Sequence, residues 1–155
     1  MKFTNNILSF IMTSTIATGV IVGCTSYEAK AKHGKAKTCL AMNIYHEARG
    51  ESIAGQIAVA QVTMNRVEHK SWPDTVCEVV YQKKQFSWTH TIKDTTPYDN
   101  DAWETAKSIA SGVYNDQEDD YVHGAVFYHA DYVTPYWAKS YEEVTRIGTH
   151  IFYRK

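Results

Sequence analysis

The sequence lacks an excess of either charge, and it contains no internal repeats or low-complexity blocks. Its 155 residues carry 16 Lys and Arg against 17 Asp and Glu, which gives a formal net charge of −1. Proteins that bind nucleic acid use clustered Lys and Arg to neutralise phosphates, so we predict no nucleic-acid partner. A chain of this length fits one domain once a leader is removed.

Cysteine is scarce, with three in the whole chain. If Cys24 belongs to an N-terminal leader, Cys39 and Cys77 remain as an even pair, and an oxidising compartment would let them form a disulfide. The closed loop would span 38 positions (77 − 39). It would fasten the start of one predicted helix to another helix near Val76. Two unrelated buried thiols are the alternative.

The first 24 residues look like an export leader rather than part of the fold. Lys2 gives a short positive region, and residues 7–22 are mostly apolar and uncharged. This run is at the short end of the range that spans a bilayer, and Ser, Thr and Gly dilute it, so we do not favour a retained transmembrane helix. We predict an exported protein of the periplasm or cell envelope.

The leader has three alternative fates, and the sequence does not choose between them. Residues 21–24, Ile-Val-Gly-Cys, resemble the bacterial lipobox, in which cleavage precedes a cysteine that becomes lipidated, here Cys24. Residues 29–31, Ala-Lys-Ala, offer an ordinary small-x-small cleavage site. The third fate is a weakly apolar anchor that is later released. The membrane is therefore a predicted partner, through the leader or through a lipid.

Composition and periodicity divide the chain into three parts. Residues 1–24 are the leader, residues 25–37 are rich in Lys and Ala and are predicted to be a flexible tether, and residues 38–155 are the folded domain. Within the domain, apolar spacing predicts helices at 39–50, 54–67, 75–81 and 99–115, and aromatic and β-branched runs predict two antiparallel strands at 124–129 and 148–153. We predict an α+β domain, mainly helical, with a small antiparallel sheet near the C-terminus.

Glu47 is the residue around which the chain is organised. Spacing of about 100° per residue places Leu40, Ile44 and Glu47 within roughly 60° on one stripe of a helix. Burial of that stripe would desolvate the carboxyl group and raise its pKa, and the negative end of the helix dipole acts in the same direction. A carboxyl group that stays protonated near neutral pH can act as the general acid for glycosidic cleavage. A solvated ion pair with Arg49 or a lysine is the alternative.

The neighbouring His46 does not complete a zinc motif. The helical signature H-E-x-x-H needs a second histidine in the fifth position, where this chain has Gly50. We therefore predict no metal site and treat His46 as a partly buried, hydrogen-bonded residue. A zinc amidase or peptidase remains an alternative of another enzyme class, with His46, His123, His129 or His150 as its ligands.

Several runs of residues, taken in order, resemble the spore-cortex-lytic (SleB-type) cell-wall hydrolases. The first is Ile-Tyr-His-Glu-Ala-Arg-Gly-Glu at 44–51, and the resemblance is colinear from Cys39 to Tyr153. The other matching runs are residues 55–60, 65–67, 72–77, 79–82, 85–87, 124–129, 135–138 and 147–153. Each run is weak evidence alone, whereas the ordered set covers essentially the whole domain.

The resemblance implies a lysozyme-like fold that cleaves the β-1,4 bond between N-acetylmuramic acid and N-acetylglucosamine in peptidoglycan. The family's acid falls on Glu47. Members are commonly lytic transglycosylases, in which one carboxylate protonates the leaving oxygen and then removes a proton from the C6 hydroxyl, unlike the two-carboxylate hydrolases. Glu51 is the nearest candidate for a second acid, in a direction that the sequence does not fix. We expect a monomer that needs no cofactor and has peptidoglycan glycan strands as its partner.

Six further residues are candidate contacts to the glycan. Gln85 and Ser87 would hydrogen-bond the sugars with Phe86 as a wall of the cleft, or else form a loop held by its own side chains. Tyr128, His129 and Trp137 would place ring faces against the sugars, or else pack in the core. The chain has 11 Tyr and 4 Trp. With Cys24, that aromatic content leaves a third alternative, a non-catalytic lipoprotein that only binds the wall.

Overall fold

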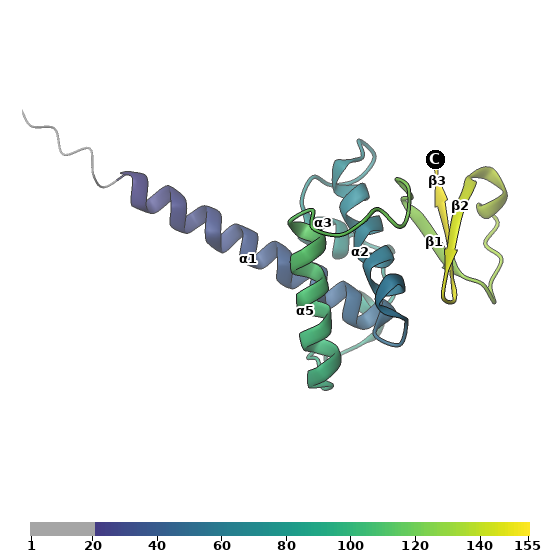
Figure 1. The fold of residues 1–155 in the computed structure, drawn as a ribbon, viewed down its shortest axis with the longest axis horizontal. Coiled ribbons are helices and arrows are strands. Elements are labelled where there is room, and N and C mark those ends of the chain that lie inside the picture. Colours follow the sequence, from purple (N-terminus) through teal and green to yellow (C-terminus); the bar gives the residue numbers. More distant parts are fainter. Residues whose placement is uncertain (1–20) are drawn as a thin grey trace, which may run out of the picture.

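The computed structural model describes residues 21–155, in which helices come first and a small sheet follows (Figure 1). The predicted α+β class is confirmed. The elements are α1 (Ile21–Ala48), α2 (Ile53–Glu68), α3 (Val76–Val80), α4 (Trp88–Thr91), α5 (Asn100–Tyr114), β1 (Phe127–Ala130), a 3-10 turn η1 (Ala138–Ser140), β2 (Glu142–Ile147) and β3 (His150–Arg154).

Side-chain caps set the starts of three helices. The Ser52 hydroxyl accepts a hydrogen bond from the Gly55 amide at the start of α2, and Thr75 does the same at the start of α3. Asp99 accepts from the Ala102 amide at 3.0 Å and begins α5, as its position in the sequence predicts. Each cap satisfies an amide that has no partner inside its helix.

Helix α1 is longer than the sequence predicts. Residues 25–37, expected to be a flexible tether, are helical and continue into the helix that carries Glu47, so that expectation is wrong. The physical reason is that Lys and Ala are strong helix formers and one interior glycine, Gly34, is too little to break the helix. The first half of α1 projects from the body (Figure 1). Residues 1–20, most of the predicted leader, lie outside the described residues, and none of the described helices is long and apolar enough to cross a membrane.

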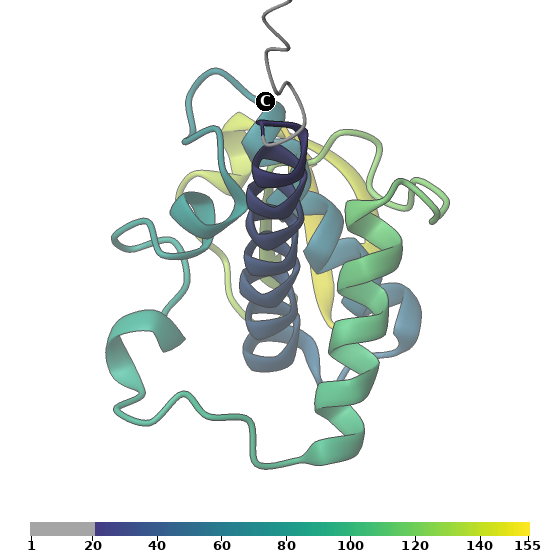
Figure 2. The same cartoon turned by 90° about the vertical axis from the view of Figure 1, so that its left-hand side faces the viewer.

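The core lies between α1, α2, α3 and α5. Viewed from the α1 side, α5 runs beside α1 and the strands lie behind (Figure 2). Leu40, Ile44 and Tyr45 of α1 are fully buried. Helix α2 corresponds to the predicted helix at 54–67, and its Val59 and Val62 are likewise fully buried. The C-terminal half of α1 is therefore fixed on several sides.

A disulfide joins α1 to α3. Cys39 and Cys77 are bonded in the structure, with their Cα atoms 5.3 Å apart. Cys39 belongs to the core, and Cys77 packs against it. The bond attaches α3 to α1 at Cys39, which lies about two helical turns before Glu47.

The sheet has three antiparallel strands in the order β1-β3-β2. The two predicted strands pair directly, with Phe127 opposite Tyr153. Strand β2 was not predicted, because its sequence Glu-Glu-Val-Thr-Arg-Ile is largely charged and belongs to an exposed edge. Side chains alternate along each strand, so Tyr128 and Phe152 face α2, whereas His129 and Tyr153 face away from it.

Candidate active site

Glu47 lies in the last turn of α1 and is half-buried, as its place on the apolar stripe predicts. Burial raises the pKa of its carboxyl group above the ordinary value. Arg49 is not its ion-pair partner, because the Arg49 guanidinium donates to the Tyr45 carbonyl and to the Tyr98 hydroxyl. The side chain of Glu47 is therefore set up to hold a proton.

Tyr128 from β1 meets Glu47 across the junction between the helices and the sheet. Its hydroxyl donates a hydrogen bond of 3.0 Å to Glu47 Oε2. This bond favours the ionised carboxylate, but the effect of burial is larger, so the pKa of Glu47 stays raised. Burial, reinforced by the nearby Glu47 charge, raises the pKa of Tyr128 well above its usual value, so Tyr128 keeps its proton and remains a donor. Glu47 Oε1 receives no hydrogen bond from the described residues, so this oxygen is open to carry a proton.

Arg66 of α2 supports the same junction and was not predicted. It is 5% exposed, and its Nε donates to the Val126 carbonyl at 2.8 Å, just before β1 begins. Its guanidinium lies 5.9 Å from the Trp72 ring centre and 5.3 Å from that of Phe86. The positive charge acts on Glu47 at longer range and lowers its pKa less than burial raises it.

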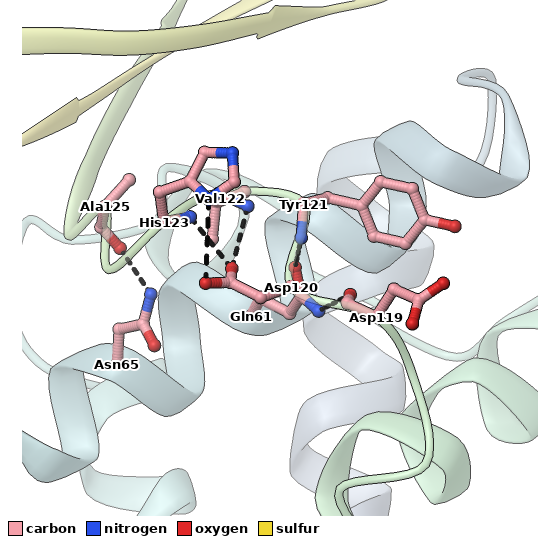
Figure 3. A network of polar contacts seen from close by, with 8 residues as sticks. All are labelled: Gln61, Asn65, Asp119, Asp120, Tyr121, Val122, His123 and Ala125. Atoms are coloured by element: carbon pink, nitrogen blue, oxygen red, sulfur yellow. Dashed lines mark hydrogen bonds and ion pairs between the residues drawn. The ribbon is translucent and has the colours of Figure 1, made fainter.

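Polar side chains of α2 hold the segment that leads into β1 (Figure 3). Gln61 donates to the Asp119 carbonyl at 2.6 Å and accepts from the Tyr121 amide at 3.0 Å. Asn65 donates to the Ala125 carbonyl at 2.9 Å. With Arg66, these bonds follow one face of α2 and fix the backbone from which Tyr128 reaches Glu47.

Glu51 forms a clamp between the end of α1 and the sheet through two hydrogen bonds to Thr149. Its Oε1 accepts from the Thr149 hydroxyl at 2.6 Å and its Oε2 from the Thr149 amide at 3.2 Å, in the turn between β2 and β3. The hydroxyl bond is the main cause that lowers the pKa of Glu51. Gly148 adjoins this contact with φ +57°, and a Cβ there would collide with Glu51 Oε2. Both carboxylate oxygens are therefore occupied in fastening the sheet to the end of α1.

His150 lies behind Tyr128 on the inner face of the sheet. It is 9% exposed, and its ring meets the Tyr128 ring edge-on at 5.2 Å between centres. Burial lowers its pKa, so the neutral imidazole is favoured. The packing of His150 against Tyr128 limits where the Tyr128 ring can move. Sequence alternation with Phe152 on β3 was the signal that could have placed it there.

The three predicted aromatic contacts do not share one face. Tyr128 lies at Glu47, whereas His129, the next residue of the strand, stacks on Tyr153 on the outer face at 5.2 Å. Trp137 also lies there, 5.6 Å from the rings of His129 and Tyr153. Neighbouring residues of a strand point to opposite faces, so His129 and Trp137 are separated from the acid by the sheet.

The three predicted glycan contacts at 85–87 also lie in different environments. Phe86 is 2% exposed and belongs to the hydrophobic core, so the prediction that its ring forms a wall of the cleft is wrong. Ser87 is exposed, and its carbonyl accepts from the Thr91 hydroxyl at 2.9 Å. Gln85 is half-buried, and its backbone N–H donates to the backbone carbonyl of Gln82. Nothing in these contacts directs Gln85 or Ser87 toward Glu47.

The histidines of the zinc alternative lie apart. His46 stacks on Trp88 at 4.4 Å and is within 3.0 Å of the Thr95 carbonyl, as expected for a hydrogen-bonded residue. His123 is exposed on a loop, and His129 and His150 face opposite sides of the sheet. Within residues 21–155, no group of three or more His, Cys, Asp or Glu side chains is placed to hold a metal ion.

Comparison with known proteins decides the family. A family model described as Cell Wall Hydrolase matches residues 50–153, beginning three residues after Glu47. The chain belongs to the cell wall hydrolase family. The resemblance to spore-cortex-lytic enzymes is confirmed by curated relatives: the spore cortex-lytic enzyme of Halalkalibacterium halodurans is 35% identical over 114 residues, and that of Bacillus cereus is 33% identical over 113.

These alignments cover 73% of this chain but only 33% and 42% of the two relatives, so the chain corresponds to less than half of each. The match to solved catalytic domains is more complete. The catalytic domain of the germination-specific lytic transglycosylase SleB from Bacillus anthracis is 32% identical, with a TM-score of 0.64 over 77% of this chain and 93% of that one. The catalytic domain of Bacillus cereus SleB gives 32%, 0.63, 77% and 91%.

Proposed function

We propose that this chain cleaves the β-1,4 bond between N-acetylmuramic acid and N-acetylglucosamine in peptidoglycan, with Glu47 as general acid and then base. The observation that carries the proposal is the Glu47 carboxyl group, half-buried with a raised pKa and held through Oε2 by Tyr128. A solved relative that is named a lytic transglycosylase supports the same chemistry.

The reaction would proceed in two proton transfers. Glu47 Oε1 gives its proton to the glycosidic oxygen, the bond to C1 breaks, and the leaving sugar departs with a new hydroxyl group. The ionised carboxylate, now favoured by the Tyr128 hydrogen bond and the Arg66 charge, takes the proton of the C6 hydroxyl as that oxygen bonds to C1. Glu47 ends protonated, and the product is an anhydro sugar.

A single carboxylate suffices for this sequence of steps. A two-carboxylate hydrolase needs a second free acid about 5–9 Å away. Glu51, the nearest candidate, has both oxygens bonded to Thr149. The occupied Glu51 therefore favours the transglycosylase over the hydrolase.

Replacement of Glu47 by Gln tests the assignment. The Glu47→Gln protein should fold but release no soluble fragments from purified peptidoglycan, because an amide cannot donate the acid proton. Glu104→Gln, at an exposed position of α5, is the matched control and should keep full activity. Mass analysis of wild-type products should show anhydro ends. Clearing by Glu47→Gln would overturn the role of Glu47, and hydrated ends alone would overturn the transglycosylase.

Two measurements separate this proposal from its alternatives. A zinc amidase would be stopped by chelators and would release peptides, whereas the glycosidase should be insensitive and release sugars. A protein that only binds the wall would pellet with sacculi and release nothing.

We further propose export to the cell envelope as a monomer, through a leader ending at Cys24 or near residues 29–31. Action on the wall requires the domain to be outside the cytoplasm. The mass of the mature N-terminus distinguishes lipidation of Cys24, cleavage near residue 31 and release of an uncleaved anchor.

A further inference from the structure

Positive charge is concentrated on the part of α1 that projects from the body, residues 26–37, which we call the projecting segment (Figure 1). These residues carry four Lys against one Glu, a formal charge of +3 with histidine counted as neutral. Residues 38–155 carry 11 Lys and Arg against 16 Asp and Glu, a formal charge of −5. The near-zero net charge of the chain therefore conceals a cationic segment attached to an acidic body.

Three of the four lysines have no partner within the molecule. Lys30, Lys32 and Lys35 are exposed, and their side chains make no hydrogen bond or ion pair with any residue of the part of the chain that the structure describes. Lys37 differs, because it donates to the Ser111 hydroxyl at 3.3 Å. Three ammonium groups are thus left for a partner outside the chain.

The free lysines lie on two sides of the projecting segment. At about 100° per residue, Lys32 and Lys35 are about 60° apart, whereas Lys30 is roughly 140–160° from both. A helix that lies in a bilayer surface has its cations on one face and several large apolar side chains on the other. Tyr27, 75% exposed, is the one large apolar side chain of the projecting segment. Cations on two sides suit a mesh of chains around the helix better than a flat lipid surface.

We propose that the projecting segment binds the carboxylates of the peptide stems of peptidoglycan and so holds the enzyme among its substrate strands; the inference rests on the function proposed above. Stem peptides carry more carboxylates than amino groups, which makes the polymer a polyanion. An acidic body is repelled by such a polymer, and the cationic segment offsets the repulsion. Complementary charge of this kind steers association and favours one partner over others.

The projecting segment and the acid belong to one continuous helix. Lys35 is 12 residues before Glu47 and Lys30 is 17 residues before it, which corresponds to about 18 and 26 Å along the axis. The wall is a mesh with stems on every strand, so the lysines and Glu47 can contact different strands at the same time. Binding by the lysines then raises the local concentration of glycan at Glu47 without any contact to the reacting atoms.

Binding of inactive protein to purified sacculi tests the inference. Two variants of full-length Glu47→Gln protein are compared. The segment variant combines Lys30→Gln, Lys32→Gln and Lys35→Gln. The body variant removes the same charge from three exposed lysines elsewhere, by Lys70→Gln, Lys83→Gln and Lys155→Gln.

The segment variant should bind sacculi about tenfold more weakly than the Glu47→Gln protein at low salt, since three exposed ion pairs correspond to about that factor. The body variant should lose much less. The difference should disappear at about 1 M salt, where charges are screened within roughly 3 Å. Gln is as good a helix former as Lys, so circular dichroism should show unchanged helix content. An equal loss by both variants, or no loss by either, overturns the inference.

Two further surfaces identify the ligand. Sacculi whose carboxylates have been amidated should bind the segment variant and the Glu47→Gln protein alike, and a persisting difference overturns the role of the stem carboxylates. Vesicles of anionic phospholipid test the rival partner. If the segment variant binds vesicles more weakly but sacculi as well as before, the partner is a lipid surface and the inference fails.

Cleavage by proteins that keep Glu47 separates this inference from the proposed function. The three segment substitutions should lower kcat/KM on sacculi at low salt. Wild type that binds sacculi through the projecting segment but releases no fragment overturns the proposed function and leaves the binding role in place. Cleavage at one rate by wild type, segment variant and body variant overturns the binding role and leaves the function.

Discussion

The Tyr128 hydroxyl donates a hydrogen bond of 3.0 Å to Oε2 of Glu47 and so joins β1 to the last turn of α1. One oxygen of the carboxyl group is thereby fixed, and the other is left for the proton that the proposed mechanism requires. The two residues are 81 positions apart in the chain, and they meet because side chains of α2 hold the backbone before β1.

Tyr128→Phe should lower activity and shift its pH dependence. The ring still fits, but loss of the donor leaves the carboxyl group free to rotate, and a hydrogen bond to a charged group is worth roughly tenfold in rate or more. Because that bond lowers the pKa of Glu47, its loss should move the alkaline limb of the activity profile to higher pH. Profiles of kcat against pH check this, with Tyr136→Phe, 95% exposed, as the unchanged control. A profile that does not move contradicts the role given to Tyr128.

Unfolding of the wild type should respond to the charge on Glu47. The folded-state pKa of Glu47 is raised, so the stability that protonation contributes is present below the unfolded pKa and is lost as pH rises through the folded one. Glu47→Gln cannot ionise and escapes this loss. The difference in melting temperature, Glu47→Gln minus wild type, should therefore become more positive as the pH rises from about 4 to about 8. A constant difference across that range would show that Glu47 is not desolvated.

Gly148→Ala should loosen the clamp between Glu51 and Thr149. The backbone at Gly148 has φ +57°, which costs an alanine about 1 kcal/mol, and the new Cβ would displace the Glu51 carboxylate. We expect a loss of roughly 2 kcal/mol in the free energy of unfolding and lower activity. Gly34→Ala is the contrasting variant, since nothing lies within 4 Å and the site is helical. It should stabilise by about 0.5–1 kcal/mol. Urea denaturation of both proteins measures the contrast.

Removal of the disulfide should cost stability without altering the chemistry. In the chain-entropy model a loop of 38 residues corresponds to about 3–4 kcal/mol. The Cys39→Ser, Cys77→Ser protein should melt at a lower temperature yet keep its kcat at temperatures where it is folded. Exported wild type should contain no thiol that reacts at either position. Labelling of both cysteines would show that the bond does not form in the cell.

Local pattern was enough to find part of the site. Glu47 was predicted because its burial depends on Leu40 and Ile44, residues of its own helix. The helices that start near residues 75 and 99 were likewise predicted from the spacing of apolar residues within each segment. Alternation along β1 could also have separated His129 from Tyr128, since adjacent residues face opposite sides.

Contacts between distant segments could not be read in this way. Glu51 meets Thr149 across 98 positions, and no local pattern distinguishes an acid bound by a hairpin turn from an acid free to react. Arg66 resembles any charged residue near the end of a helix until β1 is placed against it. Phe86 has the same neighbours in sequence whether its ring is buried or lines a cleft.

The unbroken course of α1 would set how far from the bilayer the wall is cut in a protein anchored through Cys24. From Cys24 to Glu47 the helix rises about 35 Å, at roughly 1.5 Å per residue. If Cys24 carries a lipid, this helix acts as a rigid spacer between the bilayer and Glu47. Glu47 can then reach only the glycan layers that lie within the length of the helix. A longer or shorter helix would place Glu47 at a different layer of the wall.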